Sequence, residues 1–188
     1  MSLEAAIFIA AINGDELSPK FSKSSNYKHW VSIKDDSRCT PCEENHGKIW
    51  LISEKPNPKP PAHLRCRCVI ELMQSIAAGT ATINGLDGAD WMLKYEGTLP
   101  DYYITKEDDE ANGWKRGKWP SNFVPNKMIM EDEYYNYNRH LPHITGRVWH
   151  KADINYKTGR RNSERIVWSN DGLIFVTYDH YKTFYEIA

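Results

Sequence analysis

The sequence has no long hydrophobic run and almost no net charge. Its short apolar stretch, residues 5–12, is too short to cross a bilayer and follows Glu4, not a basic segment, so we expect neither a membrane span nor a signal peptide. Residues 1–79 carry 10 basic and 9 acidic side chains, and residues 80–188 carry 14 and 16. This balance excludes a general attraction to nucleic acid, so any such binding requires a local basic patch.

Cysteine is absent from most of the chain. All four cysteines lie between residues 39 and 68, as Cys39-x2-Cys42 followed by His63-x2-Cys66-x-Cys68. Paired thiols at this spacing suit a tetrahedral zinc ion, which a small unit can use in place of a large core. The predicted ligands are Cys39, Cys42, Cys66 and Cys68, while two disulfides or free thiols remain alternatives.

Composition divides the chain into four segments. Residues 1–22 hold the apolar stretch and are typical of a leader, and Met1-Ser2-Leu3 is compatible with a fragment of a longer protein. Residues 23–74 form the Cys-rich unit. Residues 75–82, SIAAGTAT, are small and predict a flexible linker. Residues 83–188 form the second unit.

Two helices are predicted early in the second unit. Apolar side chains at helical spacing predict the first over residues 87–96, and Gly97 suits its C-terminal cap. Thr105 is a good N-cap for the second, which we expect to end at Gly113. The acidic run at residues 107–110 favours the positive end of that helix dipole, so we do not predict a metal site there.

Residues 147–188 have the pattern of an antiparallel meander. Short runs rich in β-branched and aromatic residues are separated by Lys157-Thr158-Gly159 and by Asn170-Asp171-Gly172, a strong hairpin signal. Because strand side chains alternate faces, one face can gather cations, one carboxylate and a group that titrates near neutral pH. Such a face suits a phosphodiester, and its predicted members are Lys151, Asp153, Arg161, Arg165 and His180.

Residues 83–188 resemble the barnase family of small secreted bacterial ribonucleases. The resemblance is carried by DYYITKEDDEANGW at 101–114, the run over 141–149, ADINY at 152–156, RNSERI at 161–166 and DHYKTF at 179–184. It implies an α+β fold, with N-terminal helices packed on a twisted antiparallel sheet. It also implies RNA cleavage without metal, in which the 2′-hydroxyl attacks phosphorus and leaves a 2′,3′-cyclic phosphate.

The resemblance implies roles for individual residues. His180 would be the general acid, Arg161, Arg165 and Lys106 would bind the phosphate and stabilise its developing charge, and Tyr181 would line the phosphate site.

Two structural ion pairs are implied as well. Asp153 would hold the guanidinium groups of Arg161 and Arg165, and Arg147 would pair with Asp171.

The chain departs from the family at the general base. Where the family has glutamate, this chain has Lys151. Three interpretations remain open: Lys151 acts as the base, with a pKa lowered by the neighbouring arginines; His150 replaces it through a bulge; or the enzyme is disabled.

The base-binding loop departs as well. Tyr134 can stack on a nucleobase and Asn136 can hydrogen-bond its edge, with Asp132 just before them. The carboxylate that accepts guanine's N–H donors is replaced by Asn138. The arginine-type contact of the family is replaced by Tyr137. We therefore do not expect a strict guanine preference, and an immunity protein for this domain should differ from barstar at that contact.

Residues 23–74 resemble the C-terminal part of minor head proteins of Mu-like phages. The resemblance implies a phage-derived head protein that carries a toxin domain at its end. Its residues are Trp30, Asp36-Ser37-Arg38, Cys39-Thr40-Pro41-Cys42, Gly47-Lys48, Pro60-Pro61, His63 and Cys66-Arg67-Cys68.

The sequence thus predicts an RNA-cleaving toxin domain of bacterial origin. Its expected partners are RNA and a barstar-like or other immunity protein, with no membrane partner and no cofactor for catalysis, and a structural zinc is expected at the cysteines. We expect a bacterial cytoplasmic or virion-associated protein that acts in a target-cell cytoplasm. The alternative is an inactive, phage-head-derived protein that binds RNA or an inhibitor.

Overall fold

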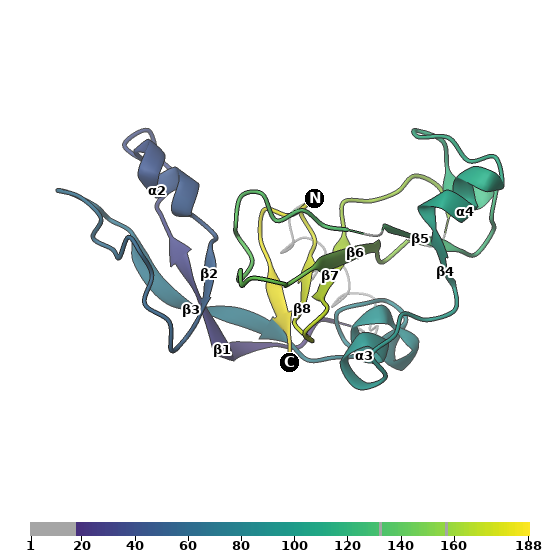
Figure 1. Cartoon of the computed structure of the whole chain (residues 1–188), viewed down its shortest axis with the longest axis horizontal. Coiled ribbons are helices and arrows are strands. Elements are labelled where there is room, and N and C mark those ends of the chain that lie inside the picture. Colours follow the sequence, from purple (N-terminus) through teal and green to yellow (C-terminus); the bar gives the residue numbers. More distant parts are fainter. Residues whose placement is uncertain (1–17, 132, 157) are drawn as a thin grey trace.

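The computed structural model describes residues 18–131, 133–156 and 158–188, and the apolar stretch at residues 5–12 lies outside them. The described chain forms one nine-stranded sheet with short helices beside it (Figure 1). The strand order is β2-β1-β3-β9-β8-β7-β6-β5-β4. The strands are β1 (Phe21–Val31), β2 (Ile49–Leu51), β3 (Val69–Ile76), β4 (Tyr103–Thr105), β5 (Met128–Glu131), β6 (Trp149–Asp153), β7 (Arg165–Ser169), β8 (Ile174–Thr177) and β9 (Tyr185–Ile187). The helices are α2 (Thr40–Asn45), α3 (Ala89–Tyr95) and α4 (Lys106–Ala111), with 3-10 turns η1 (Gly85–Asp87) and η2 (Pro120–Asn122).

The predicted meander is confirmed. Strands β6 to β9 pair antiparallel in sequence order, and the β6/β7 register runs without a shift from Trp149 opposite Ser169 to Asp153 opposite Arg165. The expected tight turn joins β7 to β8, where Gly172 has φ +91°. A positive φ is strained for residues with a Cβ, which explains why glycine stands there.

Both predicted helices form with the expected ends. Helix α3 stops one residue before Glu96, and Gly97 follows with a positive φ of 73°. Thr105 caps α4, since its hydroxyl accepts the N–H of Asp108 at 3.0 Å. These ends depend on local sequence, which is why the pattern alone predicted them.

The sheet buries apolar side chains on both faces. On one face, α3 packs over a cluster that includes Leu93, Ile166 and Val176. On the other face, Trp149 and Phe175 pack in a second cluster. The catalytic candidates therefore extend from a sheet held rigid on both sides.

The N-terminal strands extend the sheet instead of forming a separate body. Strand β3 pairs with β9 in parallel, with Ser75 opposite Glu186. The buried Glu186 carboxylate accepts hydrogen bonds from Ser24 Oγ at 2.5 Å and from Asn26 Nδ2 at 2.7 Å. The Cys-rich unit is thus joined to the second unit by backbone and side-chain hydrogen bonds.

The segment expected to be a linker is built into this junction. Its first two residues belong to β3, and the buried Asp90 carboxylate accepts the N–H groups of Gly79 at 2.7 Å and Ala81 at 2.9 Å. A Cβ added to Gly79 would lie 3.1 Å from the Trp91 ring, so the backbone runs close against α3 at this glycine. The unit boundaries themselves stay a prediction.

The α+β class is confirmed in its coarse form, a large sheet with few helices. The sheet is mixed, because β3 pairs with β9 and β4 with β5 in parallel. Within residues 83–188, the β4/β5 pair differs from the antiparallel sheet that was expected. Across the described ranges, we find no helix long and apolar enough to span a membrane.

Candidate functional site

The sheet face opposite α3 carries the polar side chains. Asp153 lies directly across from Arg165, and Lys151 is two positions earlier on the same strand. Because side chains alternate, all three extend from this face. His150 extends from the other face, where its ring stacks on Trp168 at 5.5 Å. The unbroken β6/β7 register leaves no bulge, so the interpretation that used His150 as the base was wrong.

Asp153 holds two arginines on this face. Its buried carboxylate accepts Arg161 Nε at 2.6 Å and Nη2 at 2.8 Å, and Arg165 Nε lies 2.8 Å from it. Arg165 Nη1 also donates to the carbonyls of Asn162 at 2.9 Å and Glu164 at 2.7 Å. Two guanidinium groups facing one carboxylate leave a positive charge, which suits a phosphate group. We call this group the arginine pair.

A strained loop presents His180. His180 and Tyr181 have φ values of +60° and +68°, in the left-handed region that side chains rarely adopt. Thr177 Oγ1 accepts the Tyr181 N–H at 2.9 Å and donates to Asp179 Oδ1 at 3.0 Å. The same Asp179 oxygen accepts two further backbone N–H groups. The hydrogen bonds of Thr177 and Asp179 therefore offset the strain.

Pairing places this loop beside the arginine pair. Thr177 lies directly across from Arg165, and the His180 N–H donates to the Ser163 carbonyl at 3.1 Å. The His180 side chain is exposed. Sequence reasoning missed Thr177 and Asp179 as positioning residues, although the threonine two residues before Asp-His-Tyr was a usable signal.

Stacked aromatic rings connect His180 to the expected base site. The ring of Tyr134 stacks on Tyr181 at 4.9 Å and 22°, and the His180 ring lies 4.9 Å from that of Tyr181. The Tyr134 N–H donates to the Trp149 carbonyl at 2.8 Å, which ties the loop to β6. A hollow of about 430 Å³ lies along residues 134–141, the loop expected to bind a base, which we call the base-recognition loop. Tyr134 can therefore present a flat ring next to the acid candidate.

The side chain of Asn136 closes this loop. Its Nδ2 donates to the Leu141 carbonyl at 2.8 Å, and its Oδ1 accepts the Leu141 N–H at 3.2 Å. This amide thus satisfies the loop's own backbone, and the expectation that it also binds a base edge stays a prediction. Asn138 contacts His140, and Tyr137 is 86% exposed. Asp132 lies outside the described residues.

Helix α4 carries Lys106, which was expected at the site, and Asp109, which was not. Lys106 Nζ pairs with Glu110 at 3.8 Å along the helix, so the structure does not join it to the arginine pair. Asp109 is fully buried, and neither carboxylate oxygen has a hydrogen-bond partner among the described residues. Burial raises the pKa of Asp109, while the Arg161 charge opposes that rise. Sequence reasoning assigned the whole acidic run to the helix dipole and missed this burial.

Arg147 and Asp171 form the second ion pair. Arg147 Nη2 lies 2.7 Å from Asp171 Oδ2, and its Nη1 donates to the Pro142 carbonyl at 2.7 Å. Hydrogen bonding from Arg147 lowers the pKa of Asp171. The pair ties the β7–β8 turn to the segment before β6.

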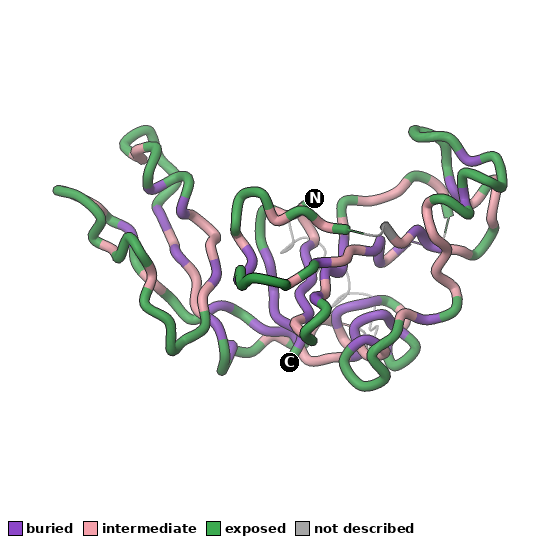
Figure 2. Tube along the Cα trace, in the orientation of Figure 1, coloured by how far each residue is buried: buried purple, intermediate pink, exposed green. Residues whose placement is uncertain are grey.

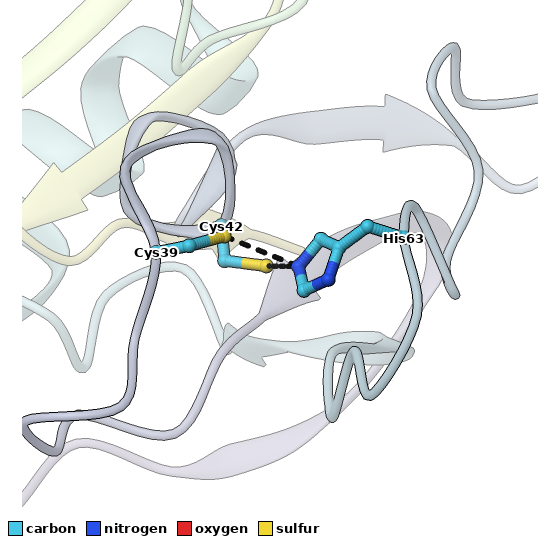
Figure 3. A group of neighbouring side chains, drawn as sticks. All are labelled: Cys39, Cys42 and His63. Atoms are coloured by element: carbon cyan, nitrogen blue, oxygen red, sulfur yellow. Dashed lines mark hydrogen bonds between the residues drawn. The ribbon is translucent and has the colours of Figure 1, made fainter.

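The cysteines gather around Cys42. Cys39 Sγ and Cys42 Sγ each lie 3.1 Å from His63 Nε2 (Figure 3), and Cys42 Sγ lies 3.8 Å from Cys66 Sγ. Two triads of possible metal ligands share Cys42, one with Cys39 and His63 and one with Cys66 and Cys68. All four cysteines are free, since a disulfide requires a sulfur separation of about 2.05 Å. We call these five residues the cysteine cluster.

The donor set fits a zinc ion. Two sulfurs bound at about 2.3 Å in a tetrahedron lie about 3.8 Å apart, which matches Cys42 and Cys66. His63 Nδ1 lies 2.8 Å from the Leu64 carbonyl, the outer contact that orients a metal-bound imidazole through its other nitrogen. Burial opposes ionisation of Cys66, yet backbone N–H groups of Cys68 and Ala62 lower its pKa to about 7. The predicted ligand set omitted His63, although His-x2-Cys spacing was a signal for it.

Comparison with known proteins bears on the second unit. The family described as ribonuclease matches residues 91–188. A ribonuclease of Heyndrickxia coagulans is 46% identical over 109 residues, which cover 57% of this chain and 99% of that protein. Ribonucleases of Bacillus intermedius and Bacillus pumilus are also 46% identical over 109 residues, covering 57% of this chain and 67% of each relative.

Proposed function

Because this chain belongs to the ribonuclease family and is an endoribonuclease, we propose that it cleaves RNA by metal-free transphosphorylation on the sheet face that carries the arginine pair. The observation that carries this proposal is the Asp153 carboxylate holding Arg161 and Arg165 at 2.6–2.8 Å. Preorganised guanidinium groups stabilise the charge that grows on a phosphate during attack.

Each bond change has a candidate group. The 2′-oxygen attacks phosphorus and forms a P–O bond while its proton passes to the base. The bond from phosphorus to the 5′-oxygen breaks, and His180 gives that oxygen a proton, which leaves a 2′,3′-cyclic phosphate and a free 5′-hydroxyl. The arginine pair binds the phosphate oxygens throughout. Stacking between Tyr134 and Tyr181 supports a base-binding role for Tyr134 beside this centre.

We assign the base position to Lys151. Its place on the site face, two residues before Asp153, supports this assignment. A neutral amine can accept the 2′-hydroxyl proton, whereas a charged ammonium can only bind phosphate. A lysine at the base position therefore also favours a second candidate function, in which the protein is inactive and binds RNA or an inhibitor.

Cleavage of a labelled RNA distinguishes the two candidates. The parent, Lys151→Glu and His180→Gln are compared with and without EDTA. We expect the parent to cleave with or without EDTA, and His180→Gln to be slower by about 10²–10⁴-fold, because it lacks the acid.

Cleavage by Lys151→Glu alone would identify the parent as a disabled enzyme. Absence of cleavage by both the parent and Lys151→Glu would favour the binding protein. The cyclic phosphate end, identified by mass spectrometry, checks the reaction type.

The cysteine cluster is assigned a structural zinc ion. Cys39, Cys42, His63 and Cys66 would hold it, with Cys68 packed beside them. The ion would supply a cross-link between α2 and the segment before β3, and no catalytic chemistry. The separations within the cluster support this role.

The biological role we assign is that of a toxin with a protein inhibitor. An enzyme that cuts RNA harms the cell that makes it, so an inhibitor covering the cleft is expected. The exposed Tyr137, at the position of the family's inhibitor-contacting arginine, supports a partner whose contacts differ from barstar's. The likeness of residues 23–74 to phage minor head proteins stays a prediction.

A further inference from the structure

A polar groove lies where the Cys-rich unit meets the base-recognition loop. It has a volume of about 460 Å³. One wall comes from the end of α2, β2 and the segment after it, and contains Lys48, Trp50 and Lys55. The other wall contains Arg139 and His143, which also line the hollow beside the loop. The groove therefore continues the expected base site outward.

One backbone hydrogen bond and apolar packing join the two walls. The Ile49 N–H donates to the His140 carbonyl at 2.8 Å, and the Ile49 side chain packs with Leu141 in the second apolar cluster. A Cβ added to Gly47 would lie 3.7 Å from the Lys182 carbonyl and 3.9 Å from the His140 ring. The groove is thus a preformed feature of the junction.

The charge of the groove is positive. Lys48, Lys55 and Arg139 face one carboxylate, Glu54, whose Oε2 accepts the Leu51 N–H at 2.9 Å. Burial lowers the pKa of His140, and the Lys48 charge lowers it further. The charge of Lys48, in the Cys-rich unit, therefore acts on a side chain of the base-recognition loop. This local excess stands out in a chain with a net charge of −1.

We propose that this groove is an RNA subsite, which binds phosphates of nucleotides beyond the base held at the base-recognition loop. Cations that follow a strand next to an aromatic ring are the general means of holding single-stranded nucleic acid, and Lys48, Lys55, Arg139 and Trp50 provide them. Arg139 has a φ of +51°, a strained conformation of the kind that clusters at binding sites. The Cys-rich unit thereby takes part in substrate binding. The inference rests on the proposed function, because it needs RNA at the neighbouring site.

The test measures RNA affinity in a background that does not need to cleave. His180→Gln protein is titrated with a 12-nucleotide RNA and with a dinucleotide, alone and combined with Lys48→Gln and Lys55→Gln. We expect the double change to weaken 12-mer binding by about tenfold, while dinucleotide affinity falls less than about twofold. The slope of log affinity against log salt concentration for the 12-mer should become shallower by about 1.4, because two phosphate contacts are lost. Lys48→Arg with Lys55→Arg should restore 12-mer binding.

A matched control removes the same charge elsewhere. Lys20→Gln with Lys23→Gln changes two exposed lysines that lie near the start of the described chain, outside the groove. If this control weakens 12-mer binding as much as the groove variant, the effect is general charge and the subsite is refuted. If 12-mer and dinucleotide lose affinity equally, the subsite is also refuted. Failure of the parent to cleave RNA would refute the proposed function without changing these affinities.

Discussion

The two ends of the sheet are stabilised in different ways. In the second unit, apolar side chains are buried on both faces of β6 to β9 (Figure 2). In the Cys-rich unit, Tyr27, Ile49 and Met73 pack into the cluster shared with the second unit. Its separate buried cluster consists of Trp30, Cys42 and Cys68, and much of the surrounding chain is exposed. A core of this size contributes little, so the cysteine cluster has to supply what packing does not. The comparison predicts that bound metal stabilises the Cys-rich unit, whereas buried ion pairs matter for the stability of the second unit.

The same contrast applies to charge. At the face that carries the arginine pair, a buried carboxylate and two cations are held by mutual hydrogen bonds on a rigid sheet. In the Cys-rich unit, Arg67 and Asp35 form a bidentate pair at 2.7 Å that is exposed to solvent. Exposed pairs contribute little, whereas breaking a buried one is costly.

Zinc removal should give the largest effect. We expect one zinc ion per chain and, on chelation, unfolding of the Cys-rich unit with β6 to β9 still folded, because structural zinc supplies about 10–16 kcal/mol of apparent binding energy in small zinc peptides. Metal analysis and thermal unfolding followed by tryptophan fluorescence measure this.

Single variants locate the zinc ligands. His63→Ala and Cys66→Ser should each weaken zinc binding by more than about tenfold in a chelator competition, since second-shell losses alone cost 10–100-fold. The exposed His143→Ala is the control. Equal zinc affinity of His63→Ala and the parent would exclude His63 as a ligand.

Breaking the buried ion pair should give the next largest effect. Asp153→Asn leaves two guanidinium groups without their carboxylate, and we expect the free energy of unfolding to fall by about 3–5 kcal/mol. Urea unfolding measures it.

Asp171→Asn is the matched control. It breaks the Arg147 pair, in which the Asp171 side chain is 39% exposed and the Arg147 side chain 9%, and should cost less than Asp153→Asn because solvent reaches this carboxylate. Similar losses in both variants would mean that burial does not separate the two pairs.

Asp109 should give the smallest change, in the opposite direction. Its pKa is raised above the ordinary value of 3.8, mainly by burial. The folded state therefore binds this proton more tightly than the unfolded state, so the contribution of Asp109 to stability is greatest below that value and is lost as pH rises through its folded pKa. Asp109→Asn should raise the free energy of unfolding at pH 7 by about 1–3 kcal/mol and flatten its pH dependence.

Urea unfolding at several pH values tests this, with the exposed Asp101→Asn as control. A loss of stability in Asp109→Asn at pH 7 would show that the charge near Arg161 outweighs the cost of burial.

Local features of the fold followed from the sequence. The Thr105 cap, the end of α3 before Gly97 and the turn at Gly172 depend on residues a few positions apart, and all three formed as predicted. The common face of Lys151, Asp153 and Arg165 followed from strand alternation.

Features that join distant segments did not. His63 meets Cys39 across 24 positions, and β3 pairs with β9 far along the chain. Such contacts depend on how the whole chain packs, which local sequence patterns do not specify.

The amino-acid order by itself determined the strands of the meander at residues 147–188, their facing residues and the chemical character of the site, because these depend on side-chain periodicity and on group identity. Only the tertiary structure decided that the Cys-rich unit continues the nuclease sheet and forms one wall of a cationic groove. The reason is physical: the edge of β9 presents N–H and C=O groups that any strand can pair with, and the packing of the whole chain selects which strand does so.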